Sequence, residues 1–524
     1  MAGCRYCCIP HRYVVVLLCF LGMLITVGFR ESFAVVVTHI SSNTTSDEES
    51  IFKNCTGKDL HVDWSGSTSQ LMHTAFFVGQ LVTSIPSGAL TATFSPKRMM
   101  GITLLITSVL FLLISESREA GIWLIFVIRT IQGIVEGMAV PSMNAIISKW
   151  ARKDERSRLI NIAYGGVYLS PAVASFCSAA TICYISWDSI MYITGSLGVA
   201  WAFVWFLVVY PSPDQAFIGE NEQRVLREQL EAARKNAGQS QSIFELPWRK
   251  FFTSLPVLAV WVGSFCRNFI FAMLISEVPQ YFKDSYGLPT ATIGVLSAAP
   301  HVCMVVFMSF GSVCFDKLIQ KRLLSVTKTR KLAQFIGYGI QGGCTFAIAF
   351  IDDYVQAFIL LCVGAAFSAF AISGFQTNPL DLAPQYAGPL TGIVRTGMLG
   401  AVVSTALASQ LPGRSRSLES WQKMFLIGGV LHLGGVIFYL IFASGERQPW
   451  AESATEFQAV EPGSGSEEVY DDHFAEESWR SETEPMLYPT QRGASNGSPR
   501  GTGHGNGDVL YGSLNACGDS RSVY

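Results

Sequence analysis

Residues 121–146 read GIWLIFVIRTIQGIVEGMAVPSMNAI, an apolar run that contains two charged side chains, Arg129 and Glu136. An α-helix of about 20 apolar residues crosses the hydrocarbon layer of a membrane, which is ~30 Å thick. The stretch therefore predicts a membrane span that carries two charges. A charge at the centre of a bilayer costs at least ~2.5 kcal/mol, so both residues are candidates for a functional site.

The same apolar pattern recurs along the whole chain of 524 residues, in which 50% of the residues are hydrophobic and 15% are charged. This composition is unusual for a soluble protein. Twelve runs are long enough to cross a membrane, which predicts an all-α, multi-pass membrane protein. The expected spans are residues 12–39, 70–93, 98–117, 121–146, 158–183, 186–210, 253–281, 290–315, 331–351, 354–377, 386–411 and 421–443.

Composition and motifs exclude several classes of protein. The net charge is −2 and charged residues gather in loops and the tail, so no nucleic-acid partner is expected. The 13 cysteines fall mostly in apolar runs, where cysteine behaves as a small buried hydrophobe and not as part of a disulfide framework. The chain has no phosphate-binding loop, nucleophile elbow or metal-spaced cluster, so we expect no enzyme, cofactor or metal. If this membrane protein moves a solute, it has no ATP-hydrolysing site to drive the movement. It would then be a secondary transporter.

Positively charged short loops of membrane proteins remain in the cytoplasm. The basic clusters lie at residues 97–98, 149–158 and 317–331. All three fall on one side of the membrane if both termini are cytoplasmic. The loop over residues 40–69 then faces the lumen or the exterior, and it carries glycosylation sequons at Asn43 and Asn54. The two signals agree on the orientation.

The spans divide six and six around a charged central stretch, as expected of a transporter built from two repeated bundles. The tail is rich in Glu, Ser, Gly and Pro and is expected to be disordered. The predicted organisation is a cytoplasmic N-terminus (1–11), a six-helix bundle (12–210), a cytoplasmic loop (211–252), a second bundle (253–443) and a cytoplasmic tail (444–524). Within the tail, Glu482, Met486 and Leu487 form an acidic-xxx-bulky-Leu pattern that sorting adaptors recognise in endosomal and lysosomal proteins, although such patterns also arise by chance.

Arg129 and Glu136 are two helical turns apart, so they share one face of a helix without touching. Burial and a nearby arginine act in opposite directions on the proton affinity of a glutamate, which suits Glu136 to bind and release protons. The alternative is a permanently ionised network that holds helices together. His73 in the second span has the same two interpretations, proton relay or hydrogen-bonded structural residue.

Arg30 and Arg267 occupy the first span of each half, so a two-fold relation between the halves brings both toward the centre. Two guanidinium groups there predict an anion site, because arginine stays charged and binds carboxylate or phosphate through a planar fork. The alternative for Arg30 is a pair with its neighbour Glu31. Arg395 lies in a small, apolar stretch and is expected to be a third cation of the site or a gate.

Three further polar residues of the spans favour structural roles. His301 and His432 are expected to be hydrogen-bonded within the bundle. Glu277 is expected at the luminal end of its span, where an interfacial carboxylate costs little.

Several stretches resemble the anion:cation symporter family of the major facilitator superfamily, which contains vesicular glutamate transporters, sialin and sodium/phosphate cotransporters. They are RTIQGIVEG (129–137), SKWA (148–151), ERSRL (155–159), PWRKFFTSLP (247–256), FCR (265–267), AISGF (371–375) and DLAP (381–384). The last helix and its exit, VIFYLIFASGERQPWA (436–451), look most like the vesicular glutamate branch.

The resemblance implies twelve helices in two bundles, and either anion import into acidic vesicles or proton-coupled anion export from lysosomes. Arg30 and Arg267 match the substrate-binding arginines of the family. Arg129 and Glu136 match its fourth-helix pair, in which the glutamate is the protonatable switch, and His73 matches a second-helix histidine.

The chain departs from the glutamate branch at four positions. Val140 and Asn144 replace a tyrosine and a histidine, Ala272 replaces a tyrosine, and Arg395 replaces an asparagine. These changes remove two phenols and an imidazole and add a guanidinium, which favours a larger or more negative anion than glutamate.

The sequence as a whole predicts a secondary transporter of small, glutamate-like organic anions, with uptake driven by the membrane potential or the proton gradient, and with sodium, chloride or phosphate as further candidate ions. We expect it in an acidic vesicle or lysosomal membrane, with the plasma membrane as an alternative. Alternative functions are a proton- or sodium-coupled symporter of acidic sugars or phosphate, a channel, and a non-transporting anion sensor.

Overall fold

A computed structural model describes most of the chain from residue 10 to residue 451. The described residues are 10–40, 66–84, 86–152, 155–212, 223–224, 226–227, 247–321, 323–375, 378–383, 386–410 and 417–451. The sequons at Asn43 and Asn54 and the sorting residues Glu482, Met486 and Leu487 lie outside these ranges. Every regular element within them is a helix.

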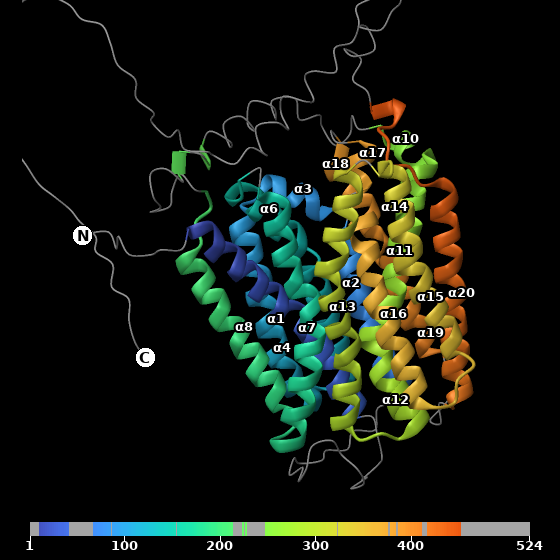
Figure 1. Cartoon of the computed structure of the whole chain (residues 1–524). Coiled ribbons are helices and arrows are strands. Elements are labelled where there is room, and N and C mark those ends of the chain that lie inside the picture. Colours follow the sequence, from blue (N-terminus) through green and yellow to red (C-terminus); the bar gives the residue numbers. More distant parts are fainter. Residues whose placement is uncertain are drawn as a thin grey trace, which may run out of the picture. The chain divides into compact units, whose positions relative to one another are not determined.

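In the first half, the helices follow the six expected spans (Figure 1). They are α1 (His11–Ile40), α2 (Gly66–Ser84) with α3 (Pro86–Thr93), α4 (Pro96–Ala120), α5 (Ile122–Glu136) with α6 (Ala139–Trp150), α7 (Arg156–Tyr184) and α8 (Ser189–Val208). One of these spans, α5 with α6, is thus divided into two helices by a turn at residues 137–138. The division between α5 and α6 falls directly after Glu136.

In the second half, the six expected spans are again helical, and three of them contain a short stretch of another helix type. They are α11 (Leu255–Ala272) with η3 (Met273–Glu277) and α12 (Val278–Tyr286), α13 (Thr290–Gln320), α14 (Val326–Gln334) with η4 (Phe335–Gly339) and α15 (Ile340–Ile348), α16 (Tyr354–Phe375), α18 (Ala387–Arg395) with η6 (Thr396–Met398) and α19 (Leu399–Ser409), and α20 (Leu418–Phe442). The short elements outside the spans are α10 (Trp248–Thr253), α17 (Asn378–Leu382) and η7 (Pro449–Ala451). Helix α13 ends at Gln320 and not at residue 315, so Lys317 is helical and not part of a loop.

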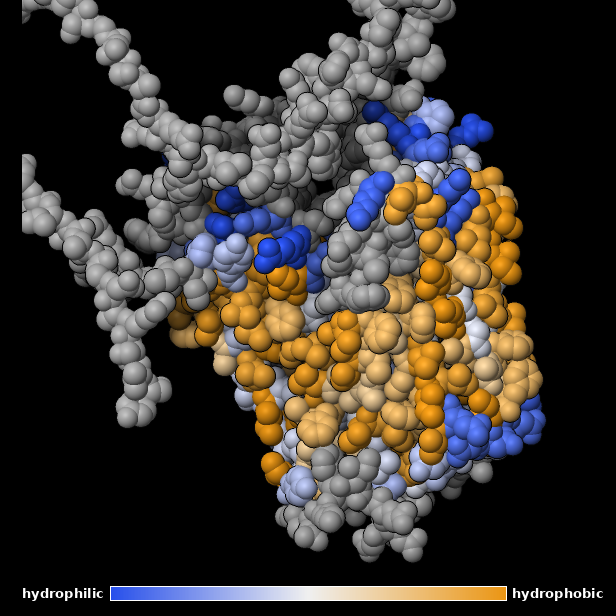
Figure 2. Space-filling model, in the orientation of Figure 1, coloured by the Kyte–Doolittle hydropathy of each residue, from blue (hydrophilic) through white to orange (hydrophobic). Residues whose placement is uncertain are grey.

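Among the described residues, ten helical stretches are long and apolar enough to cross a membrane. The two remaining stretches, α2 with α3 and α14 with α15, hold more polar residues, which include the basic end of α14. Exposed side chains in the middle of the helices are mainly apolar, and Figure 2 shows them as a band between hydrophilic residues near the two ends of the bundle. This surface is suited to contact lipid, as expected for a membrane protein.

The helices pack as two bundles, whose most extensive contacts with each other are between two pairs of helices. In the first half α1 packs on α7, α2 on α5 and α4 on α8, whereas in the second half α11 packs on α19 and α20, and α13 on α16. Helix α7 packs against α13 and α2 packs against α19, which joins the halves (Figure 1). Helices α7 and α13 each contain an internal proline, Pro171 and Pro300. This is the two-bundle arrangement expected from the sequence.

Successive spans run in opposite directions, so the bundle has two ends, here named the Ile40 end and the Trp150 end. The basic residues after the second, fourth and eighth spans lie at the Trp150 end, as the orientation argument requires. At the Ile40 end, His39 Nδ1 lies 3.0 Å from Thr290 Oγ1 of the other half. Cys183, near the same end, is disulfide-bonded, so it departs from the expectation of buried thiols.

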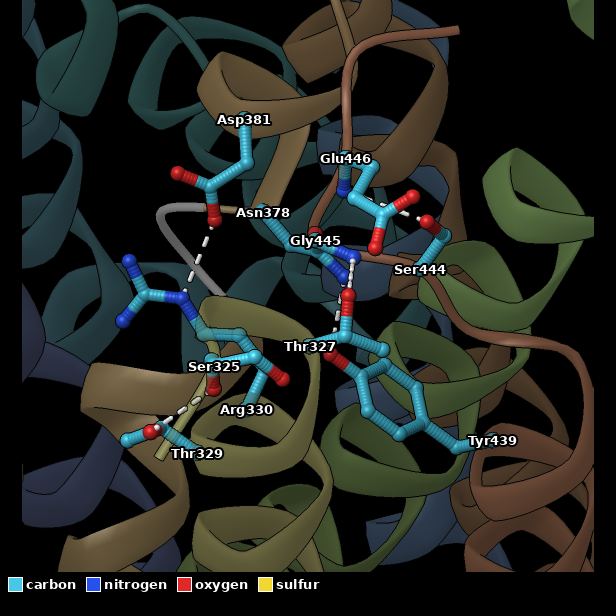
Figure 3. A network of polar contacts seen from close by, with 10 residues as sticks. All are labelled: Ser325, Thr327, Thr329, Arg330, Asn378, Asp381, Tyr439, Ser444, Gly445 and Glu446. Atoms are coloured by element: carbon cyan, nitrogen blue, oxygen red, sulfur yellow. Dashed lines mark hydrogen bonds and ion pairs between the residues drawn. The ribbon is translucent and has the colours of Figure 1, made fainter. Parts of the chain in front are cut away.

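A polar network fastens the second half at the Trp150 end (Figure 3). Arg330 Nε of α14 pairs with Asp381 Oδ2 of α17 at 3.0 Å, and the Gly445 amide donates to Thr327 Oγ1 at 2.9 Å. Asn378 Nδ2 donates to the Tyr439 hydroxyl at 2.8 Å. These bonds hold α14, α17 and the exit from α20 together beyond the apolar region.

Close packing of α2 on α5 depends on glycine. A Cβ atom on Gly133 would lie 1.9 Å from the Phe76 carbonyl oxygen, and one on Gly137 would lie 1.9 Å from Thr83 Oγ1. Both contacts are far below van der Waals distance. Gly133 and Gly137 therefore allow α2 and α5 to pack closely.

We predict that Gly133→Val lowers the melting temperature of the detergent-solubilised protein by several degrees, because the added methyl groups push α2 away from α5. Gly434→Val on α20 is the control, since a Cβ there meets nothing within 4 Å. Equal melting temperatures for the two variants would show that α2 and α5 are not in backbone contact.

Candidate functional site

A buried ion pair joins α1 and α5 in the first half. Arg30 Nη2 lies 3.1 Å from Glu136 Oε1, and only 7% and 2% of the two side chains are exposed. Glu136 is the last residue of α5, where the helix breaks before α6. Arg30 therefore pairs with Glu136 and not with its neighbour Glu31, because adjacent residues of a helix point in different directions.

Arg129 lies beside this pair but does not touch Glu136, as its spacing along the helix predicted. Its guanidinium carbon stands 4.1 Å from the ring centre of Phe33 and 4.6 Å from that of Phe76. Its Nη1 donates to Gln132 Oε1 at 3.0 Å. The Arg30 guanidinium lies 5.6 Å from the same Phe76 ring, so one aromatic ring faces both cations.

His73 of α2 completes this group. Its ring meets the Phe33 ring edge-on at a centroid distance of 5.4 Å, and the side chain is buried. Phe33 thus lies between His73 and Arg129. Arg30, Arg129, Glu136 and His73, all predicted from the sequence, form one set of side chains that we call the buried charge cluster.

Arg267 of α11 lies against helix α7 of the other half. Its Nη2 donates to the Tyr168 hydroxyl at 2.8 Å, and its guanidinium carbon lies 5.5 Å from the Phe271 ring centre. The groups that act on its charge are three phenols, those of Tyr168, Tyr338 and Tyr164. Arg267 is partly exposed, whereas Arg30 is buried.

Arg395 at the end of α18 also reaches the other half. Its Nη2 donates to the Gly137 carbonyl at 3.3 Å, directly after Glu136 in the chain. Arg395 and Arg267 both act electrostatically on the Tyr164 phenol, which accepts a hydrogen bond from Asn144 Nδ2 at 3.2 Å. Arg267, Arg395, Tyr164 and Tyr168 form a second set, which we call the arginine–tyrosine group.

Glu277 is a correction to the sequence analysis. It was expected at a membrane interface, but it is the last residue of the π-helix η3 and is only 1% exposed. The Ser404 hydroxyl donates to Glu277 Oε1 at 2.7 Å. The error arose because the length of an apolar run does not show which side of the helix faces the bundle.

The sequence analysis missed the tyrosines beside Arg267. Tyr168 and Tyr338 are buried, and tyrosine is common enough in membrane helices that neither stands out in an apolar run. Ala272, which replaces a family tyrosine, packs among Phe76, Phe77 and Ala401. Tyrosine side chains therefore lie near Arg267, although the tyrosine expected at position 272 is absent. The signal that could have identified Tyr168 is its position one turn before the internal proline, Pro171.

The two histidines for which structural roles were expected differ in their hydrogen bonding. His432 Nδ1 lies 3.2 Å from the Cys266 carbonyl oxygen, which fits the expected structural role. His301 is buried edge-on to Phe271, and its ring nitrogens have no hydrogen-bond partner among the described residues. Within the same residues, no group of three or more His, Cys, Asp or Glu could hold a metal ion.

Comparison with known proteins agrees with this geometry. The family model described as Major Facilitator Superfamily matches residues 18–398, which is more than half of the chain. The chain belongs to the major facilitator superfamily. Since known members of this superfamily are transporters, the expectation that the chain is not an enzyme is confirmed.

Among characterised relatives of this major facilitator protein, vesicular glutamate transporter 2 of Homo sapiens is 34% identical over 455 residues, covering 86% of this chain and 77% of the relative. Vesicular glutamate transporter 1 of Xenopus laevis is 35% identical over 457 residues, covering 85% and 77%. The resemblance inferred from the sequence motifs is therefore confirmed.

Solved structures support the fold alone, because their sequence identity is only 14%. A bacterial homolog of the human lysosomal transporter Spinster, inward-facing and unoccupied, has a TM-score of 0.62 and covers 85% of this chain and 100% of its own. The inward open xylose transporter XylE from E. coli has a TM-score of 0.61, with 83% and 96% covered. Both are consistent with the two six-helix bundles.

We predict that Arg30→Met lowers the free energy of unfolding by about 3–5 kcal/mol, because it leaves a carboxylate buried without its ion-pair partner. The double variant Arg30→Met/Glu136→Gln should recover most of this loss. Unfolding of the purified protein in mixed micelles measures both values. A double variant no more stable than Arg30→Met alone would contradict the pairing.

Proposed function

We propose that this chain is a proton-linked secondary transporter that carries a small organic anion of the glutamate type across the membrane of an acidic vesicle or lysosome. The observation that carries the proposal is the buried Arg30–Glu136 pair, with Arg129 beside it. Desolvation makes an ion pair inside an apolar bundle costly, so charged residues buried in membrane spans point to a functional site.

The pair links proton binding to anion binding. When Glu136 takes up a proton, it no longer neutralises Arg30, and the Arg30 guanidinium becomes available to a substrate carboxylate. When the anion leaves, Arg30 returns to Glu136 and displaces the proton. Anion and carboxylate thus compete for one guanidinium, which makes anion affinity rise as Glu136 becomes protonated.

The arginine–tyrosine group supplies the second contact to the substrate. Arg267 belongs to the second half, and its hydrogen-bond partner Tyr168 belongs to the first. An anion that replaces part of the Arg267–Tyr168 contact touches both halves. Its binding therefore shifts the equilibrium between the two relative arrangements of the halves. Alternating access then follows from a rocking motion of the bundles around the bound anion.

Three features support an orientation with the Ile40 end toward the lumen. Basic residues gather at the Trp150 end, which suits the cytoplasm. The sequons precede α2, on the chain between Ile40 and Gly66. Cys183 is disulfide-bonded near the Ile40 end, and disulfides form in oxidising compartments such as the secretory lumen.

A second candidate is symport of acidic sugars or phosphate with protons or sodium. The observation in its favour is Arg395, which brings an additional cation to the Tyr164 phenol. A more negative anion than glutamate would use both Arg267 and Arg395.

We predict that Arg267→Ala reduces uptake of labelled anion into proteoliposomes about 10- to 100-fold or more, because a charge-assisted hydrogen bond contributes about 1.5–3 kcal/mol. Lys423→Ala is the matched control, since Lys423 is an exposed cation whose ion-pair partner within the described part of the chain is Glu419 of its own helix. Retained uptake in Arg267→Ala would contradict the proposed anion site.

We predict that Glu136→Gln removes the dependence of anion binding on pH, because glutamine cannot exchange a proton. In wild type, affinity should increase as pH falls, since protonation frees Arg30. Anion-induced thermal stabilisation across a series of pH values measures this. Parallel pH profiles for wild type and Glu136→Gln would assign the proton to another residue.

A further inference from the structure

Glu31 is a buried carboxylate that the proposed cycle leaves without a role. It follows Arg30 on α1, and its side chain is fully buried. The two residues point in different directions: Arg30 faces Glu136 of α5, whereas Glu31 faces α7, where the Ser175 hydroxyl donates to its Oε1. Glu31 is thus separate from the buried charge cluster.

The surroundings of Glu31 do not neutralise a negative charge. Its Oε2 has no hydrogen-bond partner among the described residues, and neither do the buried hydroxyls of Ser32 and Ser178, which lie beside Glu31 in sequence and one turn from Ser175. A bare carboxylate in an apolar interior with a single hydroxyl donor costs several kcal/mol, far more than a neutral carboxyl group in the same place. Neutral hydroxyls and a protonated acid fit this environment.

No other charge substitutes for a proton at this position. The charge that acts on Glu31 is that of Arg30, which is already engaged by Glu136. Titratable side chains also occur on the elements that pack against α1. They include His73 of α2, Tyr164 and Tyr168 of α7, Glu277 of η3, Lys283 of α12 and His301 of α13.

The other half of the molecule packs against both helices that hold Glu31 and Ser175. Gly294 of α13 packs so closely on α7 that a Cβ there would lie 2.9 Å from the Ser175 carbonyl oxygen and 2.2 Å from Ala179 Cβ. Helix α1 also contacts η3 and α12 toward the Ile40 end. When the halves separate at that end, these elements leave α1 and α7, and water gains access to the carboxyl group.

We propose that Glu31 is a second proton-binding residue, which is protonated while the Ile40 end is closed and exchanges its proton when that end opens. The proposal rests on the proposed transport function for its place in the cycle. Glu31 would be a proton site additional to Glu136, on the other side of α1. Ser175 is the positioning residue, because its hydroxyl holds the carbonyl oxygen of the neutral acid.

Infrared spectroscopy of the purified protein in lipid nanodiscs tests the protonation state without any substrate. A protonated carboxyl group gives a C=O stretching band that a carboxylate lacks. At neutral pH this band should be present in wild type, lost in Glu31→Gln, and shifted to higher wavenumber in Ser175→Ala, which removes the hydrogen bond to Oε1. Glu277→Gln is the matched control, because Glu277 is another buried carboxyl group that accepts from a serine, and this variant should leave in place the band component that Glu31→Gln removes and Ser175→Ala shifts.

The band assignment decides the proposal even if no anion flux is found. A spectrum unchanged between wild type and Glu31→Gln would overturn the proposal, and so would a Ser175→Ala spectrum identical to that of wild type. In proteoliposomes that transport an anion, Glu31→Gln should move one proton fewer per anion than wild type. Loss of sodium dependence, with no change in proton movement, would assign the residue to sodium and reject the proton site.

Discussion

A charge inside an apolar bundle must be balanced by another group within the bundle, and this constraint governs the centre of the molecule. Arg30 is balanced by Glu136 at 3.1 Å, Arg129 by two aromatic rings and Gln132, and Arg267 by phenols. Each of these contacts is specific to one arrangement of the helices. A change in any one charge, by a proton or a bound anion, therefore changes the relative stability of the arrangements.

Two of the charged side chains, Arg267 and Arg395, lie where the two halves of the molecule meet. The Arg267–Tyr168 and Arg395–Gly137 bonds both cross from one half to the other. The first lies one turn from the internal proline of α7, and the second lies where α18 passes into η6. Arg395 donates to the carbonyl next to Glu136, so the protonatable residue and a contact between the halves share one short segment. In the proposed cycle, protonation and rearrangement are linked through this segment.

The sequence predicts the membrane spans closely, because hydrophobic length directly reflects bilayer thickness. It also identifies Arg30, Arg129, Glu136, Arg267 and Arg395, since a charge in an apolar run is conspicuous. It does not predict that Arg30 pairs with Glu136, that Tyr168 holds Arg267, or that Glu277 is buried. Those features depend on which faces of distant helices meet, and single spans with nearly uniform hydrophobicity do not encode their own rotation.

The most direct test of the account is uptake of labelled glutamate, sialic acid and phosphate by the wild-type protein in proteoliposomes, with the pH gradient and the membrane potential clamped separately. The account predicts that at least one organic anion is taken up, and that uptake responds to pH when the potential is held constant. Folded protein that moves no organic anion under either gradient, or moves one with no response to pH, would contradict it.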